Sequence, residues 1–254
     1  MKIKRVFTVV KMELKRMFSD PLSLIFTMLL VPVLILLFGL MMGDSYGWDP
    51  TETYSVFDIM FPGFLAYGSL LTIYDVAASV AGERELGIQK RINTTPLTSA
   101  EYILAQMISY TVKPLVQFAL GFGIGYAVGY RPTVGIVSYL LVILFLVLLT
   151  FSSVGFGLIT SNMAKSAGAA GGLAFVFIVP QQLFATFIPA AFMGAESFAW
   201  IFPSYYATEG IGWLFAGALS TDPGFILGKL SILLAISVVI YTIGIILYEY
   251  KKKS

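Results

Sequence analysis

The residues whose types and spacing suit a chemical role gather in one short charged stretch. Residues 82–102, "GERELGIQKRINTTPLTSAEY", carry six charged side chains between two long apolar runs. The two signs of charge are mixed, which suits contact with another protein better than contact with anionic lipid, where an all-basic run is expected. A plain helix connection needs only about 2–8 residues, so we expect a partner to hold this stretch. The candidate docking residues are Glu83, Arg84, Glu85, Gly87, Lys90, Arg91 and Pro96.

Two ionisable residues, Asp75 and Lys113, lie inside the apolar runs on either side of this stretch. Charges are costly in hydrocarbon, so such residues are functional candidates by default. At about 1.5 Å rise per helical residue, Asp75 lies roughly 12 Å from Glu83 and Lys113 roughly 18 Å from Glu101. An ion pair between two consecutive antiparallel helices is therefore feasible. The alternative is that each side chain extends separately toward water.

Several kinds of chemistry are absent from the sequence. It contains no Cys and no His, which excludes disulfides, thiolate nucleophiles, Ser-His pairs and the commonest metal ligands. No segment matches GxxxxGK[ST], since Gly228-Lys229 is followed by Leu230 inside an apolar run. We therefore expect no catalytic residue, no metal site and no cofactor bound by this chain. If ATP drives it, another subunit must bind the nucleotide.

The elements that position these residues follow from composition. The chain has 254 residues, of which 58% are hydrophobic and 12% charged, and its mean hydropathy is +0.87. Apolar runs of about twenty residues cross a bilayer as helices. We predict an all-α integral membrane protein forming a single domain over residues 1–254. Its six transmembrane helices are expected at about 22–42, 59–81, 102–128, 135–159, 168–190 and 225–248.

The placement of the cations predicts the orientation in the membrane. Thirteen of the 16 Lys and Arg residues precede the first span or follow the second, fourth and sixth spans. The opposite loops, 43–58 and 191–224, contain acidic residues but no Lys or Arg. Because positive loops stay inside, both termini and residues 82–101 are predicted to be cytoplasmic.

Two further segments flank the spans on the predicted inner side. Residues 3–18 repeat apolar side chains at helical spacing, which predicts a basic amphipathic helix in the membrane interface. The alternative is a solvated positive flank. Asp20-Pro21 is expected to end that helix and begin the first span. Gly82 is expected to close span two, and residues 83–93 are then predicted to form a short polar helix that displays Glu83, Lys90 and Arg91. Thr98 to Glu101 fit a capping box that starts span three.

On the predicted outer side, residues 191–222 are too apolar for a free loop. Pro203, Gly210 and Gly212 are expected to divide them into a broken helical hairpin that dips into the outer leaflet. In span three, Gly121, Gly125 and Gly129 form a ridge that another helix can approach closely. The ridge can serve packing within the subunit or between two subunits.

The charged stretch also resembles the signature of the ABC-2 type transporter permeases. The resemblance rests on Glu83-Arg84-Glu85-x-Gly87, Thr95-Pro96-Leu97 and Glu101-Tyr102-Ile103-Leu104, in that order. It continues through residues 157–161, 184–189 and 202–207, so it covers essentially the whole chain. Departures from the pattern occur at Gln106, Ala185 and Glu209-Gly210.

This resemblance implies a transport subunit rather than an enzyme, in the plasma membrane of a prokaryote. It implies that residues 83–97 are a cytoplasmic coupling helix that docks a separate ATPase subunit, in which ATP and Mg²⁺ are used. It further implies a second permease subunit, expected as a homodimer, with membrane lipids as surroundings and no nucleic acid as partner. The substrate would be an exported drug, lipid or glycan-type amphiphile.

In such a permease the outer hairpin would shape the substrate exit through Tyr205, Tyr206 and Trp213, or would act only as a lid. Two other functions remain open from the sequence. The first is an ion- or proton-coupled carrier that uses Asp75 and Lys113, although the two halves of the chain show no internal repeat. The second is a membrane enzyme, for which the sequence offers no nucleophile-base pair.

Overall fold

The computed structural model describes residues 3–19, 21–42, 55–88, 98–187 and 196–253, and the regular elements in these ranges are helices. The elements are α1 (Ile3–Ser19), α2 (Pro21–Met42), α3 (Val56–Glu85), α5 (Ser99–Val128), α6 (Ile136–Met163), α7 (Ala167–Gln181), the π-helix η1 (Gln182–Thr186), α8 (Glu196–Ala199), α9 (Pro203–Phe215), α10 (Ala218–Thr221) and α11 (Pro223–Lys253).

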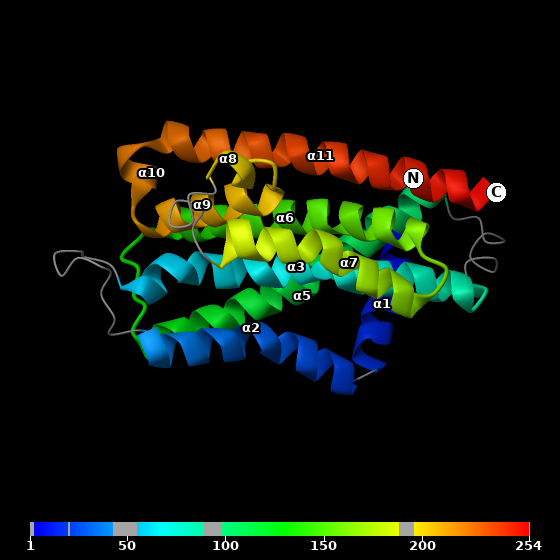
Figure 1. Ribbon diagram of the computed structural model, residues 1–254, viewed down its shortest axis with the longest axis horizontal. Coiled ribbons are helices and arrows are strands. Elements are labelled where there is room, and N and C mark those ends of the chain that lie inside the picture. The colour runs from blue at the N-terminus through cyan, green and yellow to red at the C-terminus, as the bar shows by residue number, and fades with distance from the viewer. Residues whose placement is uncertain (1–2, 20, 43–54, 89–97, 188–195, 254) are drawn as a thin grey trace.

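Five of the described helical segments are long and apolar enough to cross a membrane: α3, α5, α6, α7 with η1, and α11. The first predicted span coincides with α2, in which Met28–Met42 is a shorter apolar stretch. The chain is thus an all-helical, multi-pass membrane protein, and the sixth span stays a prediction. The long helices lie side by side, and both termini lie at one end of the bundle (Figure 1). We call this the terminal end and the opposite one the far end.

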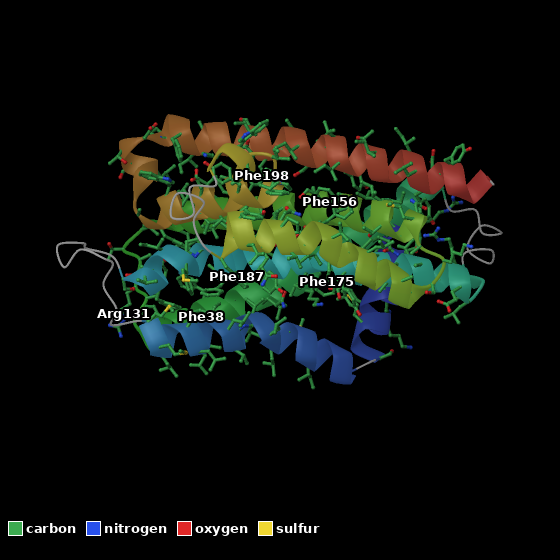
Figure 2. The ribbon with its side chains drawn as sticks, in the orientation of Figure 1. Phe38, Arg131, Phe156, Phe175, Phe187 and Phe198 are labelled. Atoms are coloured by element: carbon green, nitrogen blue, oxygen red, sulfur yellow. The ribbon has the colours of Figure 1, made fainter. Side chains whose placement is uncertain are left out.

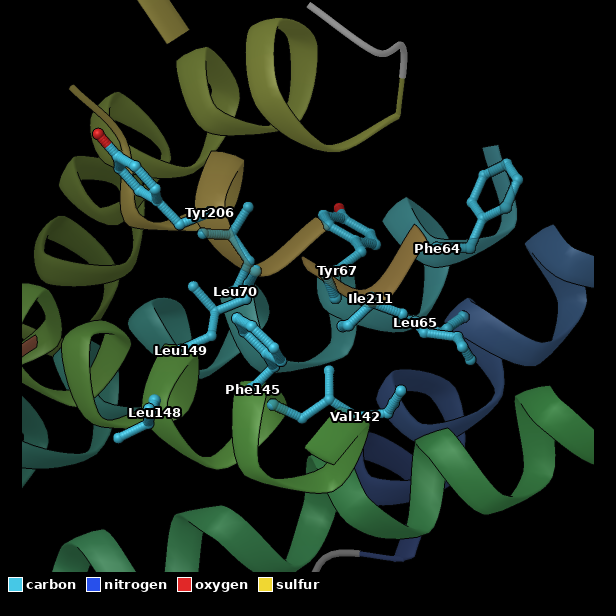
Figure 3. Packing of buried hydrophobic residues seen from close by; sticks show 14 of the residues in the cluster. Phe64, Leu65, Tyr67, Leu70, Val142, Phe145, Leu148, Leu149, Tyr206 and Ile211 are labelled. Atoms are coloured by element: carbon cyan, nitrogen blue, oxygen red, sulfur yellow. The ribbon is translucent and has the colours of Figure 1, made fainter. Parts of the chain in front are cut away.

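Helix α3 forms the centre of the bundle. Its residues from Phe61 to Leu70 are all buried, because α3 packs against α2, α5, α6, α7 and α9. Figure 3 shows Tyr67 and Leu70 of α3 beside Phe145 and Leu149 of α6, with Ile211 of α9 closing the same cluster. In a membrane such close packing stabilises helix association by van der Waals contact.

The glycine ridge of α5 is used inside the subunit. A Cβ atom on Gly121 would lie 2.7 Å from Ile35 of α2, and one on Gly125 would lie 2.4 Å from Phe61 of α3. Gly129 has φ +120° and ends the helix. Small residues therefore let α2 and α3 approach α5, which decides between the two alternatives in favour of internal packing.

The predicted break at Gly82 is wrong. Helix α3 continues through Gly82 to Glu85, and the chain turns only at Gly87, which has φ +70°. The physical reason is that Gly87 supplies the left-handed conformation that ends helices, whereas Gly82 has no positive φ and continues the helix. Glu83 therefore belongs to the spanning helix.

The predicted breaks in the outer segment are partly wrong. Pro203 begins α9 as expected, but α9 runs on through Gly210 and Gly212. A Cβ on Gly210 would lie 2.4 Å from the Phe145 ring, so this glycine makes room for α6. The chain turns instead at Gly217, which has φ +86°. Residues 191–195 of the predicted hairpin lie outside the described residues.

Helix α1 runs across the bundle at the terminal end rather than along it (Figure 1). The helix predicted over residues 3–18 is confirmed, as is the start of α2 at Pro21. Val6, Val9 and Val10 are buried against α5, whereas Lys11 and Lys15 are exposed. The protein itself therefore covers Val6, Val9 and Val10 of α1, whereas Phe7 stays 69% exposed.

Candidate functional site

Three consecutive charges at the end of α3 each bind a different helix. The Glu83 carboxylate accepts a hydrogen bond from the Tyr102 hydroxyl of α5. The Arg84 guanidinium donates to the Ser161 carbonyl and to the Asn162 side chain, 3.4 Å away, near the end of α6. Glu85 accepts a hydrogen bond of 3.0 Å from the first backbone N–H of α7, that of Ala167. This segment therefore connects the terminal ends of four helices.

These contacts change the role expected for Glu83. The sequence predicts a displayed side chain, but Glu83 is only 2% exposed because the continued helix turns it toward α5. Glu85 is exposed, Arg84 is half-buried and Gly87 forms the turn that follows. Lys90, Arg91 and Pro96 lie outside the described residues. A docking role for any of these residues stays a prediction.

Asp75 of α3 and Lys113 of α5 are brought together by the structure. The Lys113 ammonium lies 2.5 Å from the Asp75 carboxylate, and the two side chains are 6% and 18% exposed. Of the two alternatives, the ion pair is therefore the one that the fold adopts. Each charge compensates the other in an apolar environment, where a single charge is costly.

The ion pair is one end of a longer row of polar contacts between α3 and α5. From α3 the row contains Asp75, Ser79 and Glu83, at intervals of four residues. From α5 it contains residues that also recur on one helix face: Tyr102, Gln106, Tyr110 and Lys113. We call these seven residues the polar ladder.

Further polar groups follow the ion pair along the ladder toward the terminal end. Tyr110 and Ser79 interact one turn beyond the ion pair. The Gln106 amide donates to the Tyr102 hydroxyl at 2.6 Å and to the buried Glu13 carboxylate of α1 at 3.4 Å. The same polar row therefore joins α1, α3 and α5. The predicted capping box of α5 is also confirmed, with Thr98 accepting from the Glu101 backbone N–H and Glu101 accepting from that of Thr98.

A separate open pocket of about 740 Å³ lies where α3 begins, α5 ends and α9 crosses. Its polar and aromatic lining includes Asp58, Tyr130, Arg131, Tyr205, Glu209 and Trp213. Figure 2 shows Arg131 at the far end of the bundle. Of the predicted exit residues, Tyr205 and Trp213 line the pocket. Tyr206 does not: it is buried and donates its hydroxyl hydrogen bond to the Trp200 carbonyl at 2.8 Å.

An ion pair at this end is missing from the predicted site residues. Lys229 of α11 lies 2.5 Å from the Glu209 carboxylate of α9, and its ammonium lies 4.4 Å from the centre of the Tyr205 ring. Lys229 is a charged residue within an apolar run, as Asp75 and Lys113 are, so the same sequence criterion identifies it. Its partner Glu209 lies outside the predicted spans, which is why the sequence does not reveal the pair.

Two comparisons with known proteins bear on the identity of this membrane protein. A 60-residue stretch is 37% identical to the "Uncharacterized transmembrane protein YxlG" of Bacillus subtilis (strain 168), and it covers 24% of this chain and 23% of that protein. The match thus spans about a quarter of that relative. The family described as "ABC-2 type transporter" matches residues 4–215, which include the polar ladder and most of the far-end pocket. This match extends over most of the chain, and the chain therefore belongs to the ABC-2 type transporter family.

Proposed function

We propose that this chain is the permease subunit of an ATP-driven exporter that moves an amphiphilic substrate out across the plasma membrane of a prokaryote. The observation that carries the proposal is the attachment of Glu83, Arg84 and Glu85 to α5, α6 and α7. A force applied to the stretch after α3 would reach three spanning helices at once, because each holds one of these charges.

The force is expected to come from a separate ATPase subunit that docks on residues 83–97 in the cytoplasm. ATP and Mg²⁺ would be used in that subunit, since this chain has no P-loop. A second copy of the chain is expected to complete a homodimeric permease among the membrane lipids. Both termini would then be cytoplasmic, and the far-end pocket would open on the outside.

Docking can be tested by reversing charge at Lys90 and Arg91, the two basic residues of the stretch that lie outside the described residues. Lys90→Glu with Arg91→Glu should abolish recovery of an ATPase subunit when the tagged chain is purified from its native host. Lys251→Glu with Lys252→Glu makes the same charge change at the C-terminus and serves as the control. Equal recovery of the ATPase by both variants would contradict the docking site.

An ion- or proton-coupled carrier is the second candidate, and the Asp75–Lys113 pair is the observation that favours it. Such carriers use intramembrane charges as ion or proton relays. Purified chain in proteoliposomes would distinguish the two functions. Transport driven by an imposed ion gradient, without any ATPase, would support the carrier, whereas a strict need for ATP and a partner would support the exporter.

A further inference from the structure

The ammonium of Lys229 occupies a cation site built by its own protein. It lies 2.5 Å from the Glu209 carboxylate and 4.4, 5.1 and 5.5 Å from the ring centres of Tyr205, Phe225 and Tyr206. Aromatic faces with a carboxylate are the groups that recognise organic ammonium ions in general. The Lys229 side chain is only 15% exposed, so this environment replaces most of its water.

Part of this cation site is also a wall of the far-end pocket. Tyr205 and Glu209 line the pocket and contact Lys229, while Phe225 contacts the pocket residue Trp213 with ring centres 5.3 Å apart. A ligand in the pocket therefore meets the same carboxyl group and the same Tyr205 ring that contact Lys229.

The remaining lining favours a cation over an anion. Asp58 and Glu209 supply two carboxylates, and Tyr130, Trp213 and Phe215 supply further ring surface. Among the described lining residues, Arg131 supplies the single guanidinium, and it lies 5.1 Å from the centre of the Tyr126 ring. An ammonium would meet two carboxylates and several rings, whereas an anionic head group would meet Arg131 as its one cationic partner in this lining.

We propose that the far-end pocket binds the organic ammonium group of an amphiphile, and that Lys229 is a built-in competitor for Glu209 and Tyr205. The inference rests on the proposed function only in taking an amphiphile as cargo. This competition predicts the direction of one effect: removing the positive charge of Lys229 should strengthen binding of the ligand, because Lys229 then no longer competes for the Glu209 carboxylate and the Tyr205 ring.

The test uses the purified chain in maltoside micelles, because this detergent carries no ammonium group. Trp48 and Trp200 are replaced by Phe, so that the tryptophan fluorescence comes from Trp213 alone. Hexyltrimethylammonium should quench Trp213 fluorescence at a concentration about tenfold or more below that needed for hexanesulfonate, which has the same chain and the opposite charge. Equal binding of the two probes would overturn the proposal.

Two variants test the roles of Lys229 and Glu209, and a third serves as the control. Lys229→Met should raise the affinity for hexyltrimethylammonium about tenfold, and Glu209→Gln should lower it about tenfold. Asp222→Asn removes an exposed charge of the same segment outside the pocket lining and should change nothing. A lower affinity in folded Lys229→Met, or an equal loss in Asp222→Asn and Glu209→Gln, would sink the idea. If Lys229→Met does not fold, Tyr205→Leu replaces it as a variant without a charge change and should weaken binding.

A third probe, dihexanoyl phosphatidylcholine, carries the same ammonium on a lipid head group. Binding as tight as that of hexyltrimethylammonium supports the site and identifies a lipid as its source, and weaker binding supports the site and identifies a cationic amphiphile. The assay needs neither ATPase nor transport. If the protein prefers hexyltrimethylammonium over hexanesulfonate but shows no ATP-dependent export, the proposed function alone is overturned. If the protein recovers an ATPase subunit but binds the two probes equally, this inference alone is overturned.

Discussion

Asp75 and Lys113 bring two full charges into the apolar part of the bundle, and each is tolerated there because of the other. Their 2.5 Å contact pairs the ammonium with one carboxylate oxygen between α3 and α5. Removing one partner of a buried pair leaves an uncompensated charge, whereas removing both leaves only a repacked polar gap. The loss of stability therefore depends on whether one charge or both are removed.

A double-mutant cycle should show this coupling. Asp75→Asn and Lys113→Met should each lower the thermal stability of the purified protein, and the double variant should be more stable than the sum of the two losses predicts. The expected coupling energy is about 1–3 kcal/mol. The measurement is thermal unfolding in detergent, followed by the loss of monodisperse protein.

The control combines Asp75→Asn with Lys229→Met, two charges with separate partners in α5 and α9. Their effects should add. Additive losses for Asp75 and Lys113 as well would mean that the two side chains do not depend on each other.

At the scale of elements, the close approach of α3 to η1 depends on one glycine. A Cβ atom on Gly63 would lie 1.6 Å from the backbone oxygen of Thr186 and 2.7 Å from its carbonyl carbon. The π-helix η1 widens the end of α7 here, with the Thr186 hydroxyl donating to the Gln181 carbonyl at 2.8 Å. Phe187, labelled in Figure 2, then packs on Phe64 and Tyr67 of α3.

Gly63→Ala should therefore destabilise the protein by about 3 kcal/mol or more, because the obstructing atoms are backbone and cannot rotate aside. Gly123→Ala is the matched control: it lies on α5 with nothing within 4 Å of a new Cβ, and the better helix propensity of Ala should leave stability unchanged or slightly higher. Thermal unfolding in detergent compares the two. Equal stability of both variants would show that η1 can move away from α3.

At this scale the sequence predicts features that depend on neighbouring residues, and it does not predict features that depend on residues far apart in the chain. Five of the six spans, the capping box of Thr98 and Glu101, and the boundary at Pro21 depend on neighbouring residues and were predictable. The burial of Glu83 was not, because both Gly82 and Gly87 can end a helix, and in the fold it is Gly87 that adopts the positive φ. The pairing of Lys229 with Glu209 likewise depends on how α9 folds against α11.

At the scale of the whole molecule, the candidate sites lie at opposite ends. The charges of α3 and the buried Glu13 lie at the terminal end, and the aromatic pocket lies at the far end. Between them the polar ladder joins α3 and α5 along one face. In the proposed exporter this arrangement separates the place where force enters from the place where the substrate leaves, so changes at the two ends should have different effects.

Tyr205→Ala with Trp213→Ala tests this separation, because both rings line the pocket far from the predicted docking stretch. ATP-dependent accumulation of hexyltrimethylammonium in inside-out vesicles should fall about tenfold, since ring contacts contribute about 0.5–1.5 kcal/mol each, while ATPase recovery stays unchanged. Trp200→Ala removes an exposed ring of the same segment outside the pocket and should retain accumulation. Full transport in the double variant would mean that the outer hairpin acts only as a lid. Accumulation in right-side-out vesicles would contradict the proposed direction of transport, which is export. The expected pattern follows from geometry: two rings removed from the exit lower the release of substrate, while the contacts of Glu83, Arg84 and Glu85 that would receive the ATPase's force remain in place.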